Sequence, residues 1–112
     1  MSIDVRLARP HELPAAGELV ARAYVDDALI TPNDEYLQSI RDATGRARDS
    51  AVLVAADGDE LLGCVTWCSL TSSHREVARD GEGEFRMLGV SSHARGRGVG
   101  ELLVRECVTL SR

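Results

Sequence analysis

Residues 84–100 read EFRMLGVSSHARGRGVG, and this stretch decides the fold. Its first part, residues 84–90, predicts a β-strand whose apolar side chains are Phe85, Met87 and Val90. A short polar loop follows. From residue 98 to about residue 111, apolar side chains recur at helical spacing. The stretch therefore predicts a strand that enters an amphipathic helix through a loop rich in glycine and arginine.

The loop has the composition of an anion site. Gly96, Gly98 and Gly100 let the backbone come close to a ligand, because no side chain shields its amides. The first turn of the following helix leaves N–H groups without intrahelical partners, and the helix dipole adds positive potential there. Arg95 and Arg97 add guanidinium groups that match phosphate oxygens. This arrangement suits a pyrophosphate.

Three other glycine-rich loops fit the sequence less well. The dinucleotide fingerprint G-x-G-x-x-G fails, because its third glycine would fall on Glu101 or Leu103. The nucleotide-triphosphate loop needs a lysine, and the chain has none. Arg/Gly segments that bind nucleic acid are usually long and disordered, whereas this one runs directly into a helical pattern. Anion binding remains.

The rest of the chain predicts further elements, which we take as one domain over residues 1–112. They are a strand at 3–7, a helix at 11–25, a second helix from Asn33 or Asp34 to about Gly45, a strand buried on both faces at 51–56, a returning strand at 61–70 and a loop at 71–83. The order is β-α-α-β-β-β-α, an α/β (α+β) chain with a sheet flanked by helices.

The composition excludes several classes of function. The net charge is −5, which argues against a general nucleic-acid binder. All 13 basic residues are arginine. No run approaches the ~20 apolar residues of a membrane helix. The first ten residues lack the basic start and apolar run of a signal peptide. We expect a cytoplasmic protein without nucleic-acid or membrane partners.

The cysteines and histidines predict no metal site. Cys64 and Cys68 share a predicted strand, which separates them by roughly 13 Å, too far for a disulfide or a shared metal. Together with Cys107 they fit small buried side chains in a reducing compartment. The three histidines are scattered singly, without metal-ligand spacing.

Residues 95–100, RGRGVG, match the Arg/Gln-x-x-Gly-x-Gly/Ala signature of the GNAT superfamily of N-acetyltransferases. The strand at 84–90 resembles the fourth strand of that family at the expected distance, and the order of elements extends the resemblance over essentially the whole chain. It implies a mixed, mostly antiparallel sheet flanked by helices, with acetyl-CoA as co-substrate.

The resemblance also implies roles for individual residues. Backbone groups around Leu88 and Val90 would pair with the pantetheine arm, and a backbone N–H near Leu88 would stabilise the oxyanion. Amides of the loop would hold the pyrophosphate. The implied coenzyme-binding residues are Leu88, Gly89, Val90, Arg95, Gly96, Arg97, Gly98, Val99 and Gly100.

The implied reaction is direct attack of a neutral primary amine on the thioester in a ternary complex, so a base must take a proton from the amine. Glu84 is our candidate base, with Glu82 in reserve, although a glutamate at a strand entrance is often only a solvated charge. Cys107 lies on an apolar helix stripe, and we expect no histidine to activate Ser91 or Ser92, so these side chains are taken as structural.

Family members continue past this helix with further strands and a helix, often with a tyrosine that protonates the leaving thiolate. Either the sequence is a fragment or another chain supplies the missing strands; we expect a sequence that is incomplete at its C-terminus, and we assign no general acid. Two classes remain open: an N-acetyltransferase acting on a small-molecule or peptide amine, and a non-catalytic acyl-CoA-binding or interaction module of the same fold. A homodimer is compatible with either. Acceptor choice would depend on the loops at 26–34 and 71–83.

Overall fold

The computed structural model describes residues 3–48, 50–68 and 84–110. In chain order its elements are β1 (Asp4–Leu7), the 3-10 helix η1 (Pro10–Glu12), α1 (Leu13–Asp26), α2 (Tyr36–Arg41), α3 (Ala43–Arg46), β2 (Ala51–Asp57), β3 (Glu60–Cys68), β4 (Glu84–Val90), the 3-10 helix η2 (Ser92–Ala94) and α4 (Val99–Leu110). The strand and helix at either side of the glycine loop lie where the sequence predicts them.

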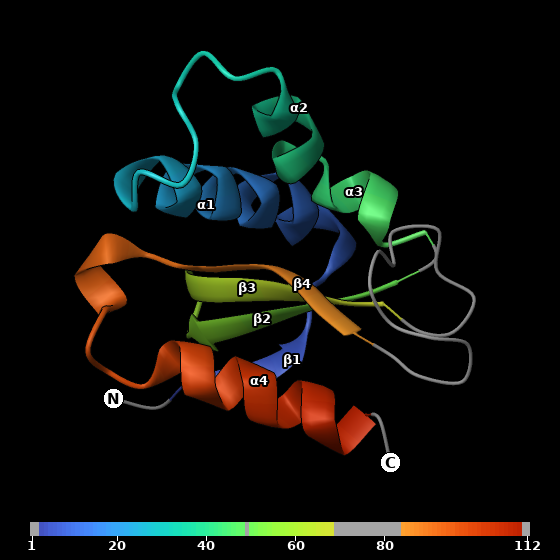
Figure 1. Ribbon diagram of the computed structural model, residues 1–112. Coiled ribbons are helices and arrows are strands. Elements are labelled where there is room, and N and C mark those ends of the chain that lie inside the picture. The colour runs from blue at the N-terminus through green and yellow to red at the C-terminus, as the bar shows by residue number, and fades with distance from the viewer. Residues whose placement is uncertain (1–2, 49, 69–83, 111–112) are drawn as a thin grey trace.

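In the described part of the chain the strands form one antiparallel sheet in the order β1-β2-β3-β4. Helices α1, α2 and α3 cover one face and α4 covers the other (Figure 1). The predicted antiparallel sheet between helical layers is thus confirmed. Strand β4 pairs with β3 on one side and forms an edge of this sheet on the other. No helix among the described residues is both long and apolar enough to span a membrane.

Strands β2 and β3 form the centre of the sheet. They are joined by a tight hairpin in which Asp57 pairs with Glu60. Strand β2 is buried on both faces, as its continuous apolar run predicts: Val52 and Val54 pack in the cluster under α1, whereas Leu53 and Ala55 pack in the cluster under α4.

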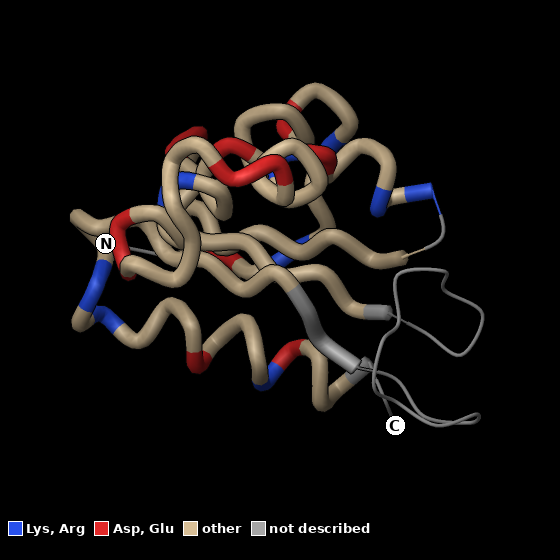
Figure 2. The backbone as a smooth tube through the Cα atoms, turned by 45° about the horizontal axis from the view of Figure 1, so that its top comes forward, with Lys and Arg blue, Asp and Glu red and all other residues tan. Residues whose placement is uncertain are grey.

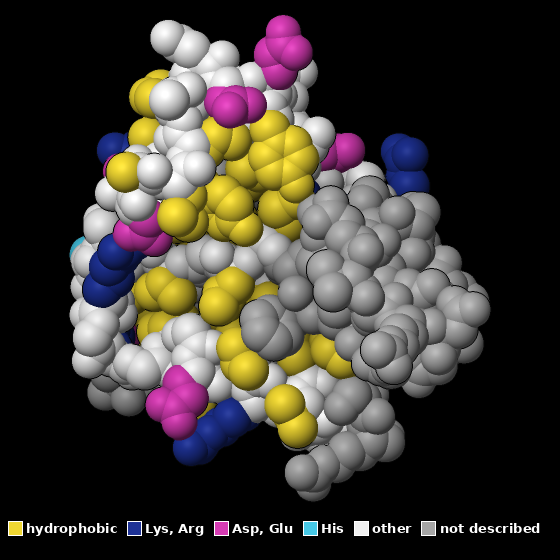
Figure 3. Space-filling model, in the orientation of Figure 1, with side chains coloured by type: hydrophobic (Ala, Val, Ile, Leu, Met, Phe, Trp, Pro, Cys, Tyr) yellow, Lys and Arg dark blue, Asp and Glu magenta, His cyan; other side chains and the backbone are white. Residues whose placement is uncertain are grey.

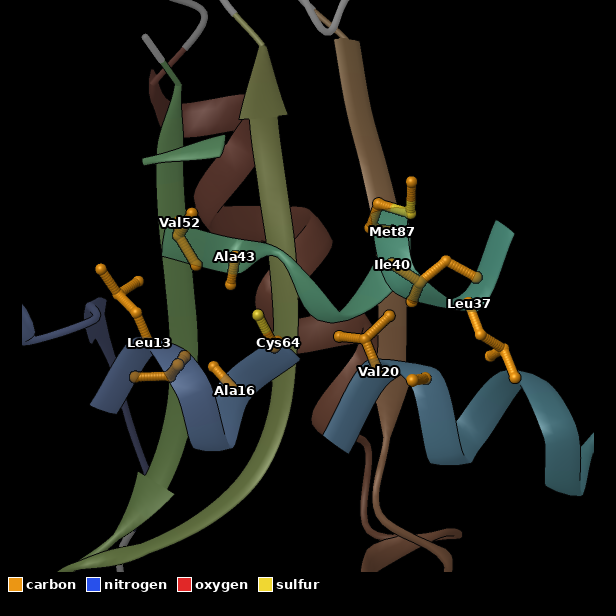
Figure 4. Packing of buried hydrophobic residues seen from close by; sticks show 11 residues of the cluster. Leu13, Ala16, Val20, Leu37, Ile40, Ala43, Val52, Cys64 and Met87 are labelled. Carbon is orange, nitrogen blue, oxygen red and sulfur yellow. The ribbon is translucent and has the colours of Figure 1, made fainter. Parts of the chain in front are cut away.

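The cluster under α1 joins the helical layer to the sheet. Figure 4 shows side chains of α1, α2 and α3 directed toward β2, β3 and β4. Helix α2 lies directly on α1, because Gly17 provides no side chain at the contact: a Cβ there would lie 1.9 Å from the carbonyl oxygen of Arg41. The labelled members are Leu13, Ala16, Val20, Leu37, Ile40, Ala43, Val52, Cys64 and Met87.

On the other face, α4 approaches β3 closely. A Cβ at Gly63 would lie 2.8 Å from Cγ1 of Val99, so glycine at this position lets the first turn of α4 rest on the strand. Val99, Leu103 and Cys107 supply the buried side of the helix, at the spacing that the sequence predicts. The start of α4, and with it the glycine loop, is therefore fixed to the sheet.

The single second helix predicted from about Asp34 to Gly45 is wrong. Asp34 does accept the N–H of Tyr36, at 2.8 Å, but the helix breaks at Asp42 into α2 and α3. The Asp42 carboxylate accepts the N–H of Gly45 at 2.9 Å and so starts a new helix, since aspartate competes with the backbone for such bonds.

Two further expectations are wrong, and a third lies partly outside the described residues. Leu7 is 61% exposed, although the alternation in the first strand predicts it on the buried side. Tyr36, whose spacing with Leu37 and Ile40 predicts an apolar stripe on the second helix, is exposed too. Strand β3 extends to Cys68; the predicted strand end at 69–70 and the loop at 71–83 lie outside the described residues.

Strand β4 carries a bulge in its middle. Thr66 pairs with Arg86 and Cys64 with Gly89, so two residues of β4 lie opposite Val65. Met87, the first of the two, has a φ of +55°. The bulge shifts the alternation of side chains: Met87 packs on the α1 side, and Leu88 and Val90 pack on the α4 side. From Met87 onward the side chains therefore alternate between the two helical layers.

Candidate functional site

A groove of about 390 Å³ runs from the edge of β4 to the first turn of α4. It is lined by Asp27, Leu88, Gly89, Val90, Ala94, Arg95, Gly96, Gly98, Val99 and Gly100. The coenzyme-binding residues predicted from the sequence are thus brought together in one place, with the exception of Arg97. Ala94 and Asp27 are additions that the sequence alone does not indicate.

One wall of the groove is a strand edge. The N–H of Ser91 donates to the carbonyl oxygen of Leu62 at 2.8 Å, which extends the pairing of β4 with β3. Because neighbouring residues in an antiparallel ladder turn their backbone groups to opposite sides, those of Val90 face away from β3. An extended ligand can therefore pair with this edge as an added strand would.

The loop before α4 exposes its backbone. Gly96 and Gly98 have φ angles of +81° and +75°, a region that favours glycine, and a Cβ built on either would meet no atom within 4 Å. The space beside this backbone is open. Helix α4 begins directly afterwards, so its unpaired N–H groups and its dipole add to a site for anions.

The other two glycines have different reasons to be glycine. A Cβ on Gly89 would lie 2.9 Å from the Cα of Val20, because α1 crosses β4 at this point. A Cβ on Gly100 would be 3.7 Å from Cγ2 of Val90, an ordinary contact distance. Packing therefore requires glycine at Gly89, whereas the protein's own atoms leave room for a Cβ at Gly100.

The charges at the groove come from two distant parts of the chain. Arg95 forms an ion pair with Asp27, which follows the last residue of α1. Figure 2 shows basic residues in the loop that leads into α4, close to the acidic end of α1. Both side chains are partly exposed, 46% for Arg95 and 37% for Asp27.

Arg97 lies beside the groove and carries an unsatisfied nitrogen. Its Nη2 atom is buried and has no hydrogen-bond partner among the described residues. Buried donors are nearly always paired, since leaving one unpaired costs about 1–3 kcal/mol.

Glu84, the candidate base, stands at the opposite end of β4 from the loop, and its backbone pairs with Cys68. Four residues separate it from Leu88, which corresponds to roughly 13 Å along a strand. Its side chain and the whole of Glu82 lie outside the described residues. The role of Glu84 therefore stays a prediction.

Contrary to expectation, a histidine does contact one of the serines. Ser91 Oγ lies 2.7 Å from His93 Nδ1, and Nε2 of the same ring lies 3.3 Å from a carboxylate oxygen of Glu60. The Ser-x-His spacing was the signal that sequence reasoning passed over. His93 and Glu60 are both more than half exposed, and neither Ser91 nor His93 lines the groove. This chain of contacts ties the loop to the β2–β3 turn.

The described cysteines are structural. Cys64 and Cys107 are buried, as the sequence predicts. Burial raises the pKa of Cys64 to about 12, so this thiol stays protonated and unreactive. The side chain of Cys68 lies outside the described residues. Among the residues that the structure describes, no three His, Cys, Asp or Glu side chains gather in a way that would hold a metal ion.

Comparison with known proteins agrees with this geometry. The sequence model described as "Acetyltransferase (GNAT) family" matches residues 14–112. No curated protein matches the sequence.

Solved structures share the fold. A GNAT family acetyltransferase from Brucella melitensis in complex with acetyl-CoA is 20% identical, with a TM-score of 0.73; the match covers 99% of this chain and 69% of that one. The histone acetyltransferase HPA2 and related acetyltransferase from Corynebacterium glutamicum is 20% identical, with a TM-score of 0.75, over 100% of this chain and 73% of that one.

A third structure has a more specific name. The ribosomal-protein-alanine N-acetyltransferase from Brucella melitensis is 26% identical, with a TM-score of 0.69, over 97% of this chain and 67% of that one. Across such matches the chain spans between 34% and 73% of the solved relative's own length.

Proposed function

The chain belongs to the GNAT acetyltransferase family, and we propose that its groove binds acetyl-CoA for transfer of the acetyl group to a primary amine. One observation carries the proposal: a free strand edge leads directly into an open, glycine-lined helix start, with Arg95 at its mouth. A ligand with an extended chain joined to a pyrophosphate would use both features: the strand edge would pair with its chain, and the helix start would hold its phosphates.

The residues present fit such a ligand. The pantetheine arm would pair with backbone groups of Leu88 and Val90 along β4, and the pyrophosphate would lie at the N–H groups between Gly96 and Gly100. The unpaired Nη2 of Arg97 would find an acceptor there. On the face that carries β4 in front, Figure 3 shows hydrophobic side chains on both sides of a band of backbone, which would flank the apolar part of the arm.

The chemistry asks three things of the chain's own residues. In acetyl transfer the amine nitrogen bonds to the thioester carbonyl carbon, the carbon–sulfur bond breaks, and the amine loses a proton. A backbone N–H near Leu88 would stabilise the charge on the carbonyl oxygen. Glu84 would take the proton, through water because it lies about 13 Å along the strand from Leu88. Loop amides would keep the coenzyme in place.

A nitrogen acceptor is the natural class for this site. The relative named as a ribosomal-protein-alanine N-acetyltransferase supports it at 26% identity. The last residue of α1 is Asp26, and the segment after it carries Asp27 and Asp34, so a cationic amine would be attracted to this side of the groove. Whether the amine belongs to a peptide or a small molecule would be decided by the loops around the groove.

Calorimetric titration of acetyl-CoA tests the binding step. Wild-type chain is expected to bind saturably, and Gly98→Glu, alone or with Arg97→Glu, to abolish binding, because a carboxylate would fill the space meant for the pyrophosphate. Gly58→Glu is the matched control: Gly58 also has a positive φ and open space around it, but lies in the β2–β3 turn away from the groove. It should bind as wild type does.

Turnover is measured separately, by release of free thiol in the presence of amines. Transfer that falls in Glu84→Gln while acetyl-CoA binding persists would support the enzymatic role. Binding without transfer to any amine would favour the non-catalytic acyl-CoA-binding module. A folded wild-type chain that does not bind acetyl-CoA would overturn the proposal.

A further inference from the structure

We propose that Asp27 is a built-in counter-ion that the coenzyme's pyrophosphate must displace from Arg95, so that it lowers the site's affinity for ligands that carry phosphate. The inference rests on the proposed function and adds a residue to it. Asp27 directly follows α1 and no anion-binding motif includes it; it enters the groove only through the fold.

The backbone holds Asp27 in place. Its N–H donates to the carbonyl oxygen of Ala23 at 3.0 Å, and the next two N–H groups, of Ala28 and Leu29, donate back into the last turn of α1 at 3.0 Å each. The helix end is therefore closed and points Asp27 at the groove, opposite the glycine loop. Arg95, on that loop, pairs with it across the mouth.

The ion pair with Asp27 occupies the guanidinium of Arg95, which is the group that a phosphate would meet first. Arg95 and Asp27 both line the groove together with the three glycines of the loop. As long as the ion pair persists, the guanidinium charge is neutralised and a carboxylate lies beside the anion site. Exposed ion pairs of this kind are weak, so a stronger anion can replace the carboxylate.

The exchange affects only ligands that engage Arg95. A ligand changes the position of Arg95 only by as much as it binds the released guanidinium better than Asp27 does. A pyrophosphate, with two or more charges and many acceptor oxygens, meets this condition. A phosphate-free acyl thioester offers Arg95 nothing, and the carboxylate stays in place. Asp27 thus lowers the affinity for the coenzyme and leaves the affinity for a phosphate-free thioester unchanged.

The test uses calorimetric titration of Asp27→Asn with inorganic pyrophosphate, acetyl-CoA and S-acetylpantetheine. We expect Asp27→Asn to bind the first two about three- to tenfold more tightly, the range that a weak ion pair allows, and S-acetylpantetheine unchanged. Asp26→Asn removes the same charge one residue earlier, where no ion pair with Arg95 is formed, and should change each affinity less than about twofold.

The double variant Asp27→Asn, Arg95→Gln separates exchange from plain repulsion. If Asp27 acts through Arg95, the gain in pyrophosphate affinity shrinks in the Arg95→Gln background. An equal gain in both backgrounds, or in Asp26→Asn, would reduce the effect to general charge and overturn the inference. Weaker binding by Asp27→Asn would also overturn it, because Asp27 would then orient Arg95 for the phosphate.

These outcomes are distinct from failure of the proposed function. Pyrophosphate that binds and responds to Asp27→Asn, in a chain that ignores acetyl-CoA, would sink the coenzyme assignment and leave the ion-pair exchange standing. Acetyl-CoA that binds without any response to Asp27→Asn would do the reverse. A chain that binds neither anion would refute both.

Discussion

Arg6 and Glu12 join the first strand to the start of the first helical layer through two parallel hydrogen bonds, with Nη1–Oε1 at 2.7 Å and Nη2–Oε2 at 2.9 Å. The same carboxylate also accepts the N–H of Arg9 at 2.8 Å. These contacts, first with Arg6 and then with the Arg9 backbone, lower the pKa of Glu12 to about 2. Glu12 is only 8% exposed, so the pairing is shielded from solvent.

The free energy of unfolding should therefore fall in acid as Glu12 becomes protonated. A depressed pKa means that the contribution of Glu12 is complete above its ordinary pKa, near 4.5, and is lost as the pH falls toward 2. Charge-assisted hydrogen bonds of this kind contribute about 1.5–3 kcal/mol. We expect Glu12→Gln to lower the free energy of unfolding by about that amount at pH 7 and by almost nothing at pH 2, measured by urea denaturation.

Glu18→Gln is the control for this measurement. Glu18 pairs with Arg41 at 3.0 Å, but both side chains are about half exposed or more. Exposed pairs contribute about 0–1 kcal/mol, so this variant should follow the wild type across the pH range. If Glu12→Gln and Glu18→Gln gave the same pH profile, the assignment of the acid transition to Glu12 would be wrong.

Arg46 is expected to be the most sensitive charged residue for folding. Its guanidinium is 2% exposed and binds the hydroxyl of Thr66 at 3.0 Å and the carbonyl oxygens of Ser39 and Ile40 at 2.7 and 2.9 Å. It thus ties α2 and α3 to β3. Arg46→Lys keeps the charge but loses the fork, and should destabilise the protein by about 2–4 kcal/mol in urea denaturation.

Two comparisons sharpen this prediction. Thr66→Val removes one hydrogen-bond acceptor with little change in shape, and should cost about 1–2 kcal/mol. Arg48→Lys changes an exposed arginine of the same segment and should lie within about 0.5 kcal/mol of wild type. Equal effects of Arg46→Lys and Arg48→Lys would mean that the buried hydrogen bonds of Arg46 contribute nothing.

The parts of the site that sequence predicts are those encoded over short distances. The strand at 84–90, the loop glycines and the stripe of α4 follow from the spacing of neighbouring residues, and the structure has them in place. The bulge at Met87 is not encoded in this spacing: Met87 and Val90 pack on opposite faces of the sheet, as any two strand residues three positions apart do.

What sequence did not predict depends on contacts between distant segments. Asp27 and Arg95 are 68 positions apart, and only the packing of α1 across β4 brings them together. The break at Asp42 is local, yet helix propensity could not reveal it, because a carboxylate within a helical pattern is compatible with a solvated side chain as well as with a new N-cap.

The backbone conformation of Ala28 predicts that glycine at this position would raise the stability. Ala28 has a φ of +57°, and the N–H of Leu29 donates to the carbonyl oxygen of Tyr24 in the helix-ending pattern that usually has glycine at this position. Ala28→Gly relieves the strain at some cost in unfolded-chain entropy, for a net gain of about 0.5–1 kcal/mol. Thermal unfolding would measure it. Ala15→Gly, at an exposed position within α1, should instead lose about 1 kcal/mol.

The last prediction separates two glycines that the family resemblance treats alike. Gly89→Ala should destabilise the protein by about 1–3 kcal/mol, because its Cβ would lie 2.9 Å from the Cα of Val20 and α1 would have to move. Gly100→Ala has room, at 3.7 Å from Val90, and replaces glycine in a helix. It should leave stability unchanged or raise it by up to about 1 kcal/mol.

For Gly100→Ala, the effect on ligand binding should run in the opposite direction to the effect on folding. Gly100 lines the groove, so a methyl group there approaches the backbone that the pyrophosphate would use, and Gly100→Ala should weaken acetyl-CoA binding in a fully stable protein. Urea denaturation and calorimetry on both variants decide the matter. A Gly100→Ala variant that binds acetyl-CoA as wild type does would show that the phosphate lies elsewhere along the loop, whereas a Gly89→Ala variant of undiminished stability would contradict the close packing of α1 on β4.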